Sequence, residues 1–262
     1  MSAFTRVDVV PDTPAWEQER RGSIGASEVA AIMGMSPYAT ALDIYKAKNG
    51  VDRHFDPQLA FYGHESEAII HKWVEQFSGI DVRLDPGFMA RSTERPHIHA
   101  SFDRVSRGPF TTWQFKTSSA YAGHVWDEGV PADIRVQVNA EMYVAGTQRS
   151  AVVVWIGGRD MRVFWEPRDN RFINKHMLPA LDAFWEGVQG GNPPEPSTIG
   201  ELAEAWPSES REAEVPEFAV EALEKRAFLL ASVKEMTEEA DQIKLAVGQW
   251  MQQEGVDTLT RD

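Results

Sequence analysis

Cysteine is absent from this chain of 262 residues. Its absence excludes disulfide bonds, thiolate-bound zinc, iron–sulfur clusters and a cysteine nucleophile. Long apolar runs are missing too, since no stretch approaches the roughly 18 residues that a membrane-spanning helix needs. The amino-terminal segment 1–14 lacks the apolar middle of a signal peptide. We therefore expect a soluble, intracellular protein with no membrane partner.

The short motifs of several enzyme classes are also missing. Neither the phosphate-binding loop GxxxxGK[ST] nor the dinucleotide fingerprint GxGxxG occurs. The Gly-x-Ser-x-Gly turn of serine hydrolases is absent as well. His97 and His99 would share one face of a strand, as a pair of zinc ligands can, but no third ligand stands nearby. We interpret these two histidines as ordinary polar positions.

Positive charge is scarce, because 26 lysines and arginines face 40 acidic residues, for a net charge of −14. An excess of negative charge opposes non-specific binding to nucleic acid. A local basic groove on an acidic body is still compatible with DNA, which would be repelled everywhere else. The basic residues of the first half that would form such a groove are Arg20, Arg21, Lys46, Lys48, Arg104, Arg107 and Lys116.

The chain divides by composition into a core, a linker and an appendage. Residues 193–216 are rich in proline, serine and glutamate, which is typical of a linker. In 217–262, apolar residues recur at intervals of three and four and predict one long amphipathic helix. Residues 1–192 would then form the main domain, which the order of its helices and strands assigns to the α+β class.

Within the core, periodicity predicts both helices and strands. Ser27 is the expected N-cap of the second half of the first helical segment, and Gly34 its stop. A turn through 106–109 is expected to join the second and third strands in a hairpin. Helices are predicted over 14–34 with a break, 40–48, 62–78, 131–144 and 174–188, and strands over 82–89, 97–103, 110–117, 151–156 and 161–165.

The hairpin is expected to gather three polar side chains. Gln114 and Lys116 are two residues apart on a strand and therefore face one side, while Trp113 and Phe115 face a core on the other. Asp103, at the end of the preceding strand, would meet them at the same end of the sheet. Carboxylate and carbonyl oxygens suit magnesium, and a lysine can orient an attacking water. A solvated polar face on an edge hairpin is the alternative.

Other residues extend this site, each with an alternative reading. Glu67 can supply a further oxygen, although acids favour the first turn of any helix. Gln137 can hydrogen-bond beside the site from its helix, although it also suits a helix surface. Arg20 with Arg21 and the helix start at Ser27 fits an anion site, or a surface arginine pair beside an N-cap.

Five segments between about Ala15 and Trp165 carry a family resemblance: RRGSIGASEV, FYGHESE, SFDRV, QFK and VQVNAEMY, in that order. They resemble the phage lambda exonuclease and YqaJ-type viral recombinase family, which are PD-(D/E)XK nucleases. The resemblance implies a nuclease-like core with a mixed central sheet flanked by helices. It also implies a magnesium-dependent 5′→3′ exonuclease on linear double-stranded DNA, which leaves a 3′ single strand for phage-type recombination.

The resemblance implies roles for individual residues around two magnesium ions, for which manganese can substitute. Asp103 would be the central ligand, with Glu67, Gln114 and the backbone carbonyl of Phe115 as further ligands. Lys116 would position the attacking water.

The resemblance also implies a surrounding DNA site and partners. Arg20 and Ser27 match the 5′-phosphate pocket, Ser101 lies where the strand enters, and Gln137 supports the site from its helix. The implied partners are 5′-phosphorylated duplex ends, a single-strand annealing protein and two further copies in a homotrimeric ring. The implied location is the cytoplasm of a bacterial host.

One position departs from the family pattern, because Gln114 stands where the family has an acid. An amide keeps a carbonyl oxygen but removes a negative charge on which magnesium affinity depends. Three explanations of Gln114 remain open: the protein works naturally with a QXK site, it is an engineered trap for a DNA complex, or it is a relative that only binds DNA. Our preferred hypothesis is an active nuclease, against a DNA-end-binding relative without activity or a protein unrelated to nucleic acid.

Overall fold

The computed structural model describes residues 3–10, 13–51, 56–78, 82–83, 88–106, 110–205 and 214–260. The chain divides into two compact units, Met1–Ala205 and Trp206–Asp262. Within the described ranges, no helix combines the length and the apolar character needed to cross a membrane.

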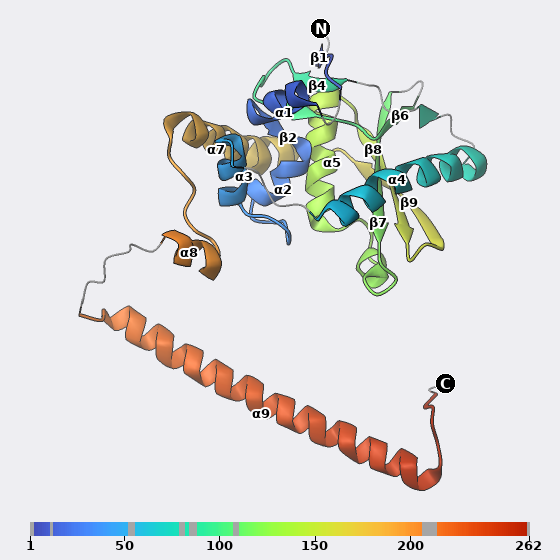
Figure 1. Cartoon of the computed structure of the whole chain (residues 1–262), viewed down its shortest axis with the longest axis vertical. Helices are drawn as coiled ribbons and strands as arrows, with labels where there is room; N and C mark the ends of the chain where they lie inside the picture. The colour runs from blue at the N-terminus through green and yellow to red at the C-terminus, as the bar shows by residue number, and fades with distance from the viewer. Residues whose placement is uncertain are drawn as a thin grey trace. The chain divides into compact units, whose positions relative to one another are not determined.

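Two sheets form the centre of the first unit (Figure 1). The four-stranded sheet runs in the order β1 (Phe4–Val7), β4 (Met89–Ser92), β5 (Ile98–Ala100) and β2 (Ile24–Gly25). The five-stranded sheet runs in the order β3 (Val82–Arg83), β6 (Arg104–Ser106), β7 (Thr111–Ser118), β8 (Arg149–Ile156) and β9 (Asp160–Pro167). Each sheet combines antiparallel pairs with one parallel pair, β2–β5 and β7–β8. The expected α+β fold with mixed sheets and flanking helices is confirmed.

Helices surround these sheets at most of the predicted positions. Short helical turns of other types extend three of them: a 3₁₀ turn precedes α2, and π-helical turns follow α4 and precede α7. The helices are α1 (Pro14–Arg21), α2 (Val29–Ile32), α3 (Ala41–Lys48), α4 (Pro57–Trp73), α5 (Ala132–Ala145), α6 (Asn170–Phe172), α7 (Leu178–Gly190) and α8 (Ile199–Ala205).

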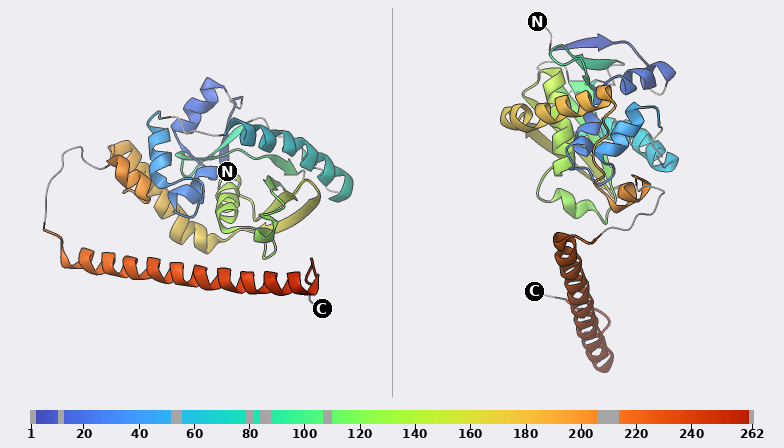
Figure 2. Two further views of the ribbon diagram at one scale, coloured as in Figure 1. Left: turned by 60° about the horizontal axis from the view of Figure 1, so that its bottom comes forward. Right: turned by 90° about the vertical axis from the view of Figure 1, so that its left-hand side faces the viewer.

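Helices α4 and α5 cover opposite faces of β7 and β8 (Figure 2). The alternation of side chains along β8 shows this directly, because Ala151 and Val153 pack with α4 while Val152 and Val154 pack with α5. On β7, Trp113 and Phe115 pack into the core shared with α4, and the prediction that they face a core is confirmed. The polar residues between them on β7 therefore face α5.

Helix α5 also packs against the four-stranded sheet and thereby joins the two sheets. Val136, Ala140 and Val144 share a core with strands β2 and β5. Val138 and Met142, on another side of the helix, share a core with β8. A helix that is buried on two sides needs apolar residues around most of its circumference. Any polar side chain on its buried part is therefore held in a fixed position.

The predicted hairpin is corrected in one respect. The strand that pairs with β7 is β6, which begins at Arg104, whereas the predicted strand 97–103 yields only β5, in the other sheet. Asp103 thus lies just before β6 and does not end a strand. The predicted strand 82–89 is also divided, since β3 and β4 belong to different sheets. The turn residues 107–109 lie outside the described residues.

The predicted N-cap at Ser27 is wrong. The 3₁₀ turn before α2 begins at Ala26, with Gly25 as its cap, and the Glu28 carboxylate accepts a hydrogen bond of 2.8 Å from the Gly25 N–H. Ser27 is instead an exposed residue within the turn. Gly34 has a φ of 68°, a conformation that favours glycine, and it follows the end of α2 as predicted.

The predicted linker 193–216 contains helix α8. Thr40 donates a hydrogen bond to Glu201 of this helix, and Lys46 forms a 2.6 Å ion pair with its Glu204. The first unit consequently extends to Ala205. The second unit contains the predicted long helix, α9 (Glu217–Glu254). The assignment of nuclease function to the first unit, with the second as a helical appendage, stays a prediction.

Candidate active site

Asp103 and Gln114 meet where the pairing of β6 with β7 ends. Arg104 pairs with Trp113 in the antiparallel register, so Asp103 comes next to Gln114. The Gln114 Nε2 donates a hydrogen bond of 2.6 Å to Asp103 Oδ2, and the Phe115 N–H donates a second of 2.7 Å to the same oxygen. The short β6 leaves this N–H of β7 available for the carboxylate. The sequence prediction that Asp103 and Gln114 lie together is supported by this geometry.

Gln137 of α5 connects the strand residues to the helix. Its Nε2 donates hydrogen bonds of 3.0 Å to Gln114 Oε1 and 2.8 Å to Glu141 Oε1. Its Oε1 accepts a hydrogen bond of 3.1 Å from Lys116 Nζ. Gln137 therefore holds three side chains from two elements in one network, because Gln114 and Lys116 face α5.

Glu141 is a site residue that our sequence reasoning did not single out. It lies one helical turn after Gln137, and its surface is fully buried. Its Oε2 has no hydrogen-bond partner among the described residues. One feature of the sequence could have identified it: Glu141 is the one charged residue in the segment 136–145, which belongs to a largely apolar helix. A lone charge in such a segment is either paired or functional.

Arg104 is a second residue that sequence reasoning left outside the site. Its guanidinium forms an ion pair of 3.3 Å with Glu67 of α4, and it also donates a hydrogen bond to the backbone oxygen of Asp103. It lies 5.4 Å from the centroid of the Phe115 ring. Glu67 is thus placed beside the site through Arg104, and its negative charge acts on Asp103.

The carboxyl groups of Asp103, which is partly buried, and of Glu141, which is fully buried, hold protons more tightly than usual. Burial raises the pKa of Asp103 to about 7, and the charge of Glu67 adds to this against the opposing effects of Lys116, the Phe115 N–H and Arg104. Burial also raises the pKa of Glu141 to about 8, with further repulsion from Asp103. Asp103 and Glu141 therefore interact electrostatically, and both lack a full counter-charge.

The donor set fits a divalent cation that the resemblance implies. Asp103, Glu141 and the Gln114 amide offer hard oxygen donors, which magnesium and manganese prefer. The unpartnered Glu141 Oε2 is a buried acceptor that a cation would satisfy. A cluster of three or more acidic, histidine or cysteine side chains arranged to hold a metal is not found among the described residues. The site therefore rests on two carboxylates supplemented by amide and backbone oxygens.

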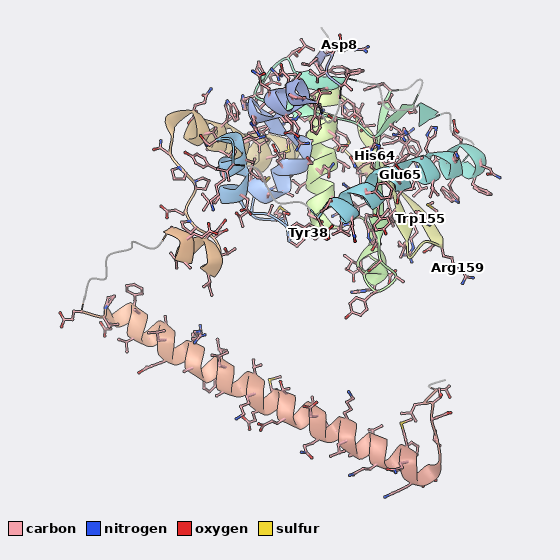
Figure 3. All side chains as sticks on the ribbon, viewed as in Figure 1. Asp8, Tyr38, His64, Glu65, Trp155 and Arg159 are labelled. Carbon is pink, nitrogen blue, oxygen red and sulfur yellow. The ribbon has the colours of Figure 1, made fainter. Side chains whose placement is uncertain are left out.

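A cavity of about 700 Å³ adjoins this network. Lys116 and Gln137 line it together with Arg20 and Ser27, which come from the amino-terminal part of the chain. Tyr38, labelled in Figure 3, also lines the cavity and is 86% exposed. The structure thus brings the predicted phosphate-binding residues to the same cavity as the predicted catalytic lysine. Its volume suits a nucleotide-sized group.

Arg20 is held at the cavity by neighbouring side chains. Its guanidinium lies 4.6 Å from the Trp16 ring centroid and 3.7 Å from Glu28 Oε1. The Glu28 carboxylate in turn accepts a hydrogen bond of 2.6 Å from the buried Lys48. A guanidinium that is oriented in advance loses less entropy when it binds a phosphate.

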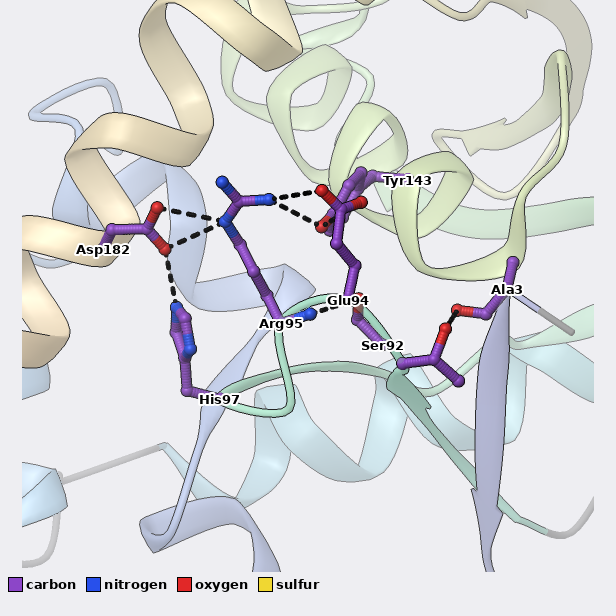
Figure 4. Close-up of polar contacts among 8 residues, drawn as sticks. Ala3, Ser92, Glu94, Arg95, His97, Tyr143 and Asp182 are labelled. Atoms are coloured by element: carbon purple, nitrogen blue, oxygen red, sulfur yellow. Dashed lines mark hydrogen bonds and ion pairs between the residues drawn. The ribbon is translucent and has the colours of Figure 1, made fainter. Parts of the chain in front are cut away.

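The remaining predicted residues lie apart from the network. Ser101 is exposed and precedes Asp103 between the two sheets. His97 bonds to Asp182 at 2.9 Å beside Arg95, as Figure 4 shows, whereas His99 bonds to Ser23 at 2.8 Å. The two histidines thus serve different structural contacts, in agreement with their interpretation as ordinary polar positions.

Comparisons with known proteins agree with this fold. The chain is 30% identical over 186 residues to the uncharacterized protein YqaJ of Bacillus subtilis (strain 168), which covers 68% of this chain and 57% of that protein. The chain thus spans little more than half the length of this curated relative. Residues 15–148, about half of the chain, match the family described as the YqaJ-like viral recombinase domain.

Solved structures of phage-type exonucleases share the fold. The alkaline exonuclease LHK-Exo of Laribacter hongkongensis, in complex with dAMP, matches 68% of this chain and 94% of its own with a TM-score of 0.57 at 17% identity. A phage-related exonuclease from Haemophilus somnus 129PT matches 64% and 96% with a TM-score of 0.50 at 13% identity. At these identities the likeness concerns the fold alone. The family follows from the sequence match over residues 15–148: this chain belongs to the YqaJ-like viral recombinase family.

Proposed function

We propose that this protein is a magnesium-dependent exonuclease that degrades linear double-stranded DNA from the 5′ end. It would leave a 3′ single strand for phage-type recombination. The observation that carries the proposal is the shared cavity: Lys116, in contact with the carboxylate network through Gln137, lines the same space as Arg20 and Ser27. Membership of the family and the fold shared with two exonucleases of known structure support it.

The metal would be held on the side of the cavity formed by β6, β7 and α5. Asp103, Gln114 and the backbone carbonyl of Phe115 are the proposed ligands, with Glu67 as a further acid. Magnesium, or manganese in its place, would stabilise the charge of the phosphodiester and of the leaving oxygen, and two ions would allow both at once. Asp103 is fixed for this role by its two hydrogen bonds.

Lys116 is the proposed group that positions the attacking water. Its ammonium is held by Gln137 and reaches the cavity, where it would donate a hydrogen bond to the water and neutralise charge at the phosphate. Attack of the water on phosphorus breaks the P–O3′ bond, so the released nucleotide leaves with a 3′-hydroxyl and its original 5′-phosphate. The attacked phosphate stays on the shortened strand as its new 5′-phosphate. Gln137 acts as a positioning residue, because its side-chain oxygen accepts a hydrogen bond from Lys116 and thereby orients the ammonium.

Arg20 and Ser27 would select the DNA end. A guanidinium and a hydroxyl suit the terminal 5′-phosphate, and Ser101 would contact the strand near the metal. Holding the 5′ end at a fixed distance from the hydrolytic site sets the direction of degradation. The net charge of −14 would keep DNA away from the rest of the surface. A homotrimeric ring and a single-strand annealing partner complete the proposal.

A DNA-end-binding relative without cleavage is the second candidate. It is favoured by the Gln114 Nε2, because this N–H donates to the Asp103 oxygen that a metal would otherwise use. In that case the cavity would bind a 5′-phosphorylated end and release it unchanged.

The experiment uses linear duplexes labelled at the 5′ or the 3′ strand end, with 5′-phosphate or 5′-hydroxyl termini, in magnesium and in EDTA. We expect magnesium-dependent release of the 5′ label from the phosphorylated strand first, while a 3′ label stays on strands that become shorter with time. The Arg20→Ala variant should lose the preference for the phosphate, whereas Arg159→Ala, an exposed arginine outside the cavity lining, should retain it. Binding without degradation in magnesium and manganese would favour the second candidate, and no binding to ends would refute both.

A further inference from the structure

We propose that Glu141 of helix α5 is a metal-ligating residue and supplies the carboxylate that Gln114 lacks. The inference rests on the proposed function, since it assumes a divalent cation at this site. It differs from the family pattern, which places the acid on the strand at the position of Gln114. The two residues belong to one network, because Gln137 Nε2 donates to Gln114 Oε1 at 3.0 Å and to Glu141 Oε1 at 2.8 Å.

The burial of Glu141 needs a functional or structural partner. Its surface is 0% exposed, and transfer of a carboxylate from water to such a position is costly unless charge and hydrogen bonds compensate. Gln137 compensates one oxygen only. The second oxygen, Oε2, has no hydrogen-bond partner among the described residues.

Two other buried glutamates of the first unit provide an internal comparison. Glu28 Oε2 accepts hydrogen bonds from Lys48 and the Gly25 N–H, and its Oε1 lies 3.7 Å from Arg20. Glu201 accepts hydrogen bonds on both oxygens, from Thr40 and from the residues before α8. These are structural glutamates with satisfied oxygens. Glu141 differs from both, because one oxygen is satisfied and the other is left for a ligand.

The charge at the site points to the same conclusion. With Gln114 in place of an acid, Asp103 is the one carboxylate of the pair formed by Asp103 and Gln114. When ionised, Glu141 adds a second negative charge, and it lies close enough to Asp103 for the two carboxylates to repel each other. Two such carboxylates without a cation oppose each other, whereas a divalent ion between their oxygens neutralises both. The acid that the family pattern has on β7 would thus be replaced by Glu141 of α5, on the side of the helix that faces β7.

The test is a titration of the full chain with Mn²⁺ in the absence of DNA. The electron paramagnetic resonance signal of free Mn²⁺ measures how much of the ion remains unbound. The variants are Glu141→Gln, Gln114→Glu and the double variant that exchanges the two residues. Glu166→Gln is the matched control, since it removes a largely buried carboxylate that pairs with Arg135 away from the network. We expect Glu141→Gln to weaken Mn²⁺ binding by about tenfold or more, the double variant to recover most of it, and the control to bind like the wild type.

Thermal unfolding in EDTA separates a ligand from a structural residue. Replacing a buried carboxylate that has one unpartnered oxygen should leave the melting temperature unchanged or raise it, whereas loss of a glutamate with both oxygens satisfied lowers it. Glu141→Met, which has similar volume and no charge, provides a second variant that should fold and bind Mn²⁺ as weakly as Glu141→Gln.

The outcomes are distinguishable from those of the proposed function. If the Glu141 variants bind Mn²⁺ like the wild type while the wild type degrades DNA, the role of Glu141 is refuted and the nuclease assignment stands. If the wild type neither binds Mn²⁺ nor degrades DNA, both are refuted. Lower melting temperatures of both variants in EDTA, with unchanged Mn²⁺ affinity, would identify Glu141 as structural and overturn the inference.

Discussion

The Gln114 amide donates a hydrogen bond of 2.6 Å to the Asp103 carboxylate. A carboxylate at the same position would accept hydrogen bonds only and would repel Asp103. The substitution of the family's acid by Gln114 therefore changes the metal-free site from a repulsive pair into a hydrogen-bonded one. This exchange lowers the number of charges that a cation must neutralise and stabilises the site without metal.

Gln114→Glu is expected to destabilise the metal-free protein. It removes the hydrogen bond to Asp103 and adds a third carboxylate near Asp103 and Glu141, which should lower the free energy of unfolding by about 1–3 kcal/mol. Mn²⁺ should restore the lost stability, because binding to the folded state alone stabilises it. Denaturant unfolding in EDTA and in Mn²⁺ measures both effects.

Gln148→Glu is the control for this change, because it alters an exposed glutamine outside the network. It should unfold like the wild type in EDTA. Equal stability of Gln114→Glu and the wild type in EDTA would contradict the role assigned to the Asp103 hydrogen bond.

Lys116→Ala is expected to reduce the rate of DNA degradation by about 100-fold or more, the range for loss of a group that positions or transfers protons. Binding to duplex ends should change much less, since Arg20 and Ser27 remain in the cavity. Single-turnover degradation and a separate binding titration without metal distinguish the two. Lys175→Ala, an exposed lysine outside the lining of this cavity, should degrade DNA at the wild-type rate. An unchanged rate for Lys116→Ala would remove this lysine from the mechanism.

His99 is expected to make stability fall in acid. Burial, with the positive charges of Lys48, Arg20 and Arg91, lowers the pKa of His99 well below its usual value. The folded protein therefore keeps the ring neutral, while the unfolded chain takes up a proton below about pH 6.5. Proton uptake by the unfolded state alone favours unfolding, so stability is highest above this pH and decreases as the pH falls.

The comparison with His99→Gln isolates this contribution. The free energy of unfolding is measured from pH 7.5 to pH 5.5. Below about pH 6.5, one group can add a slope of at most roughly 1.4 kcal/mol per pH unit to this free energy. The wild type should lose free energy of unfolding faster than the variant in this range. Parallel pH profiles would show that His99 takes up its proton in the folded state as well.

A chain truncated after Ala205 is expected to fold without the second unit, because the first compact unit ends there. Truncation after 192, at the predicted domain boundary, removes α8 and its hydrogen bond from Thr40 to Glu201. The shorter fragment should be less stable by about 1–3 kcal/mol, since Thr40 also caps α3. Denaturant unfolding of the two fragments measures the difference. Equal stabilities would show that α8 contributes nothing to the first unit.

Local patterns predicted the elements around the site well. The alternation of Trp113 and Phe115 with Gln114 and Lys116 follows from strand geometry and is seen in β7. Patterns failed where pairing is non-local. The division of 97–106 between β5 and β6 depends on which sheet each strand joins, and no property of that short segment determines this.

The sequence by itself determined the family, part of the candidate site and the strand face on which Gln114 and Lys116 lie, because these depend on motif order and on side-chain alternation. The tertiary structure alone decided that Asp103 reaches Gln114 from the start of β6, and that α5 places Glu141 beside them. Those contacts join segments distant along the chain, and their positions are set by the packing of one helix between two sheets.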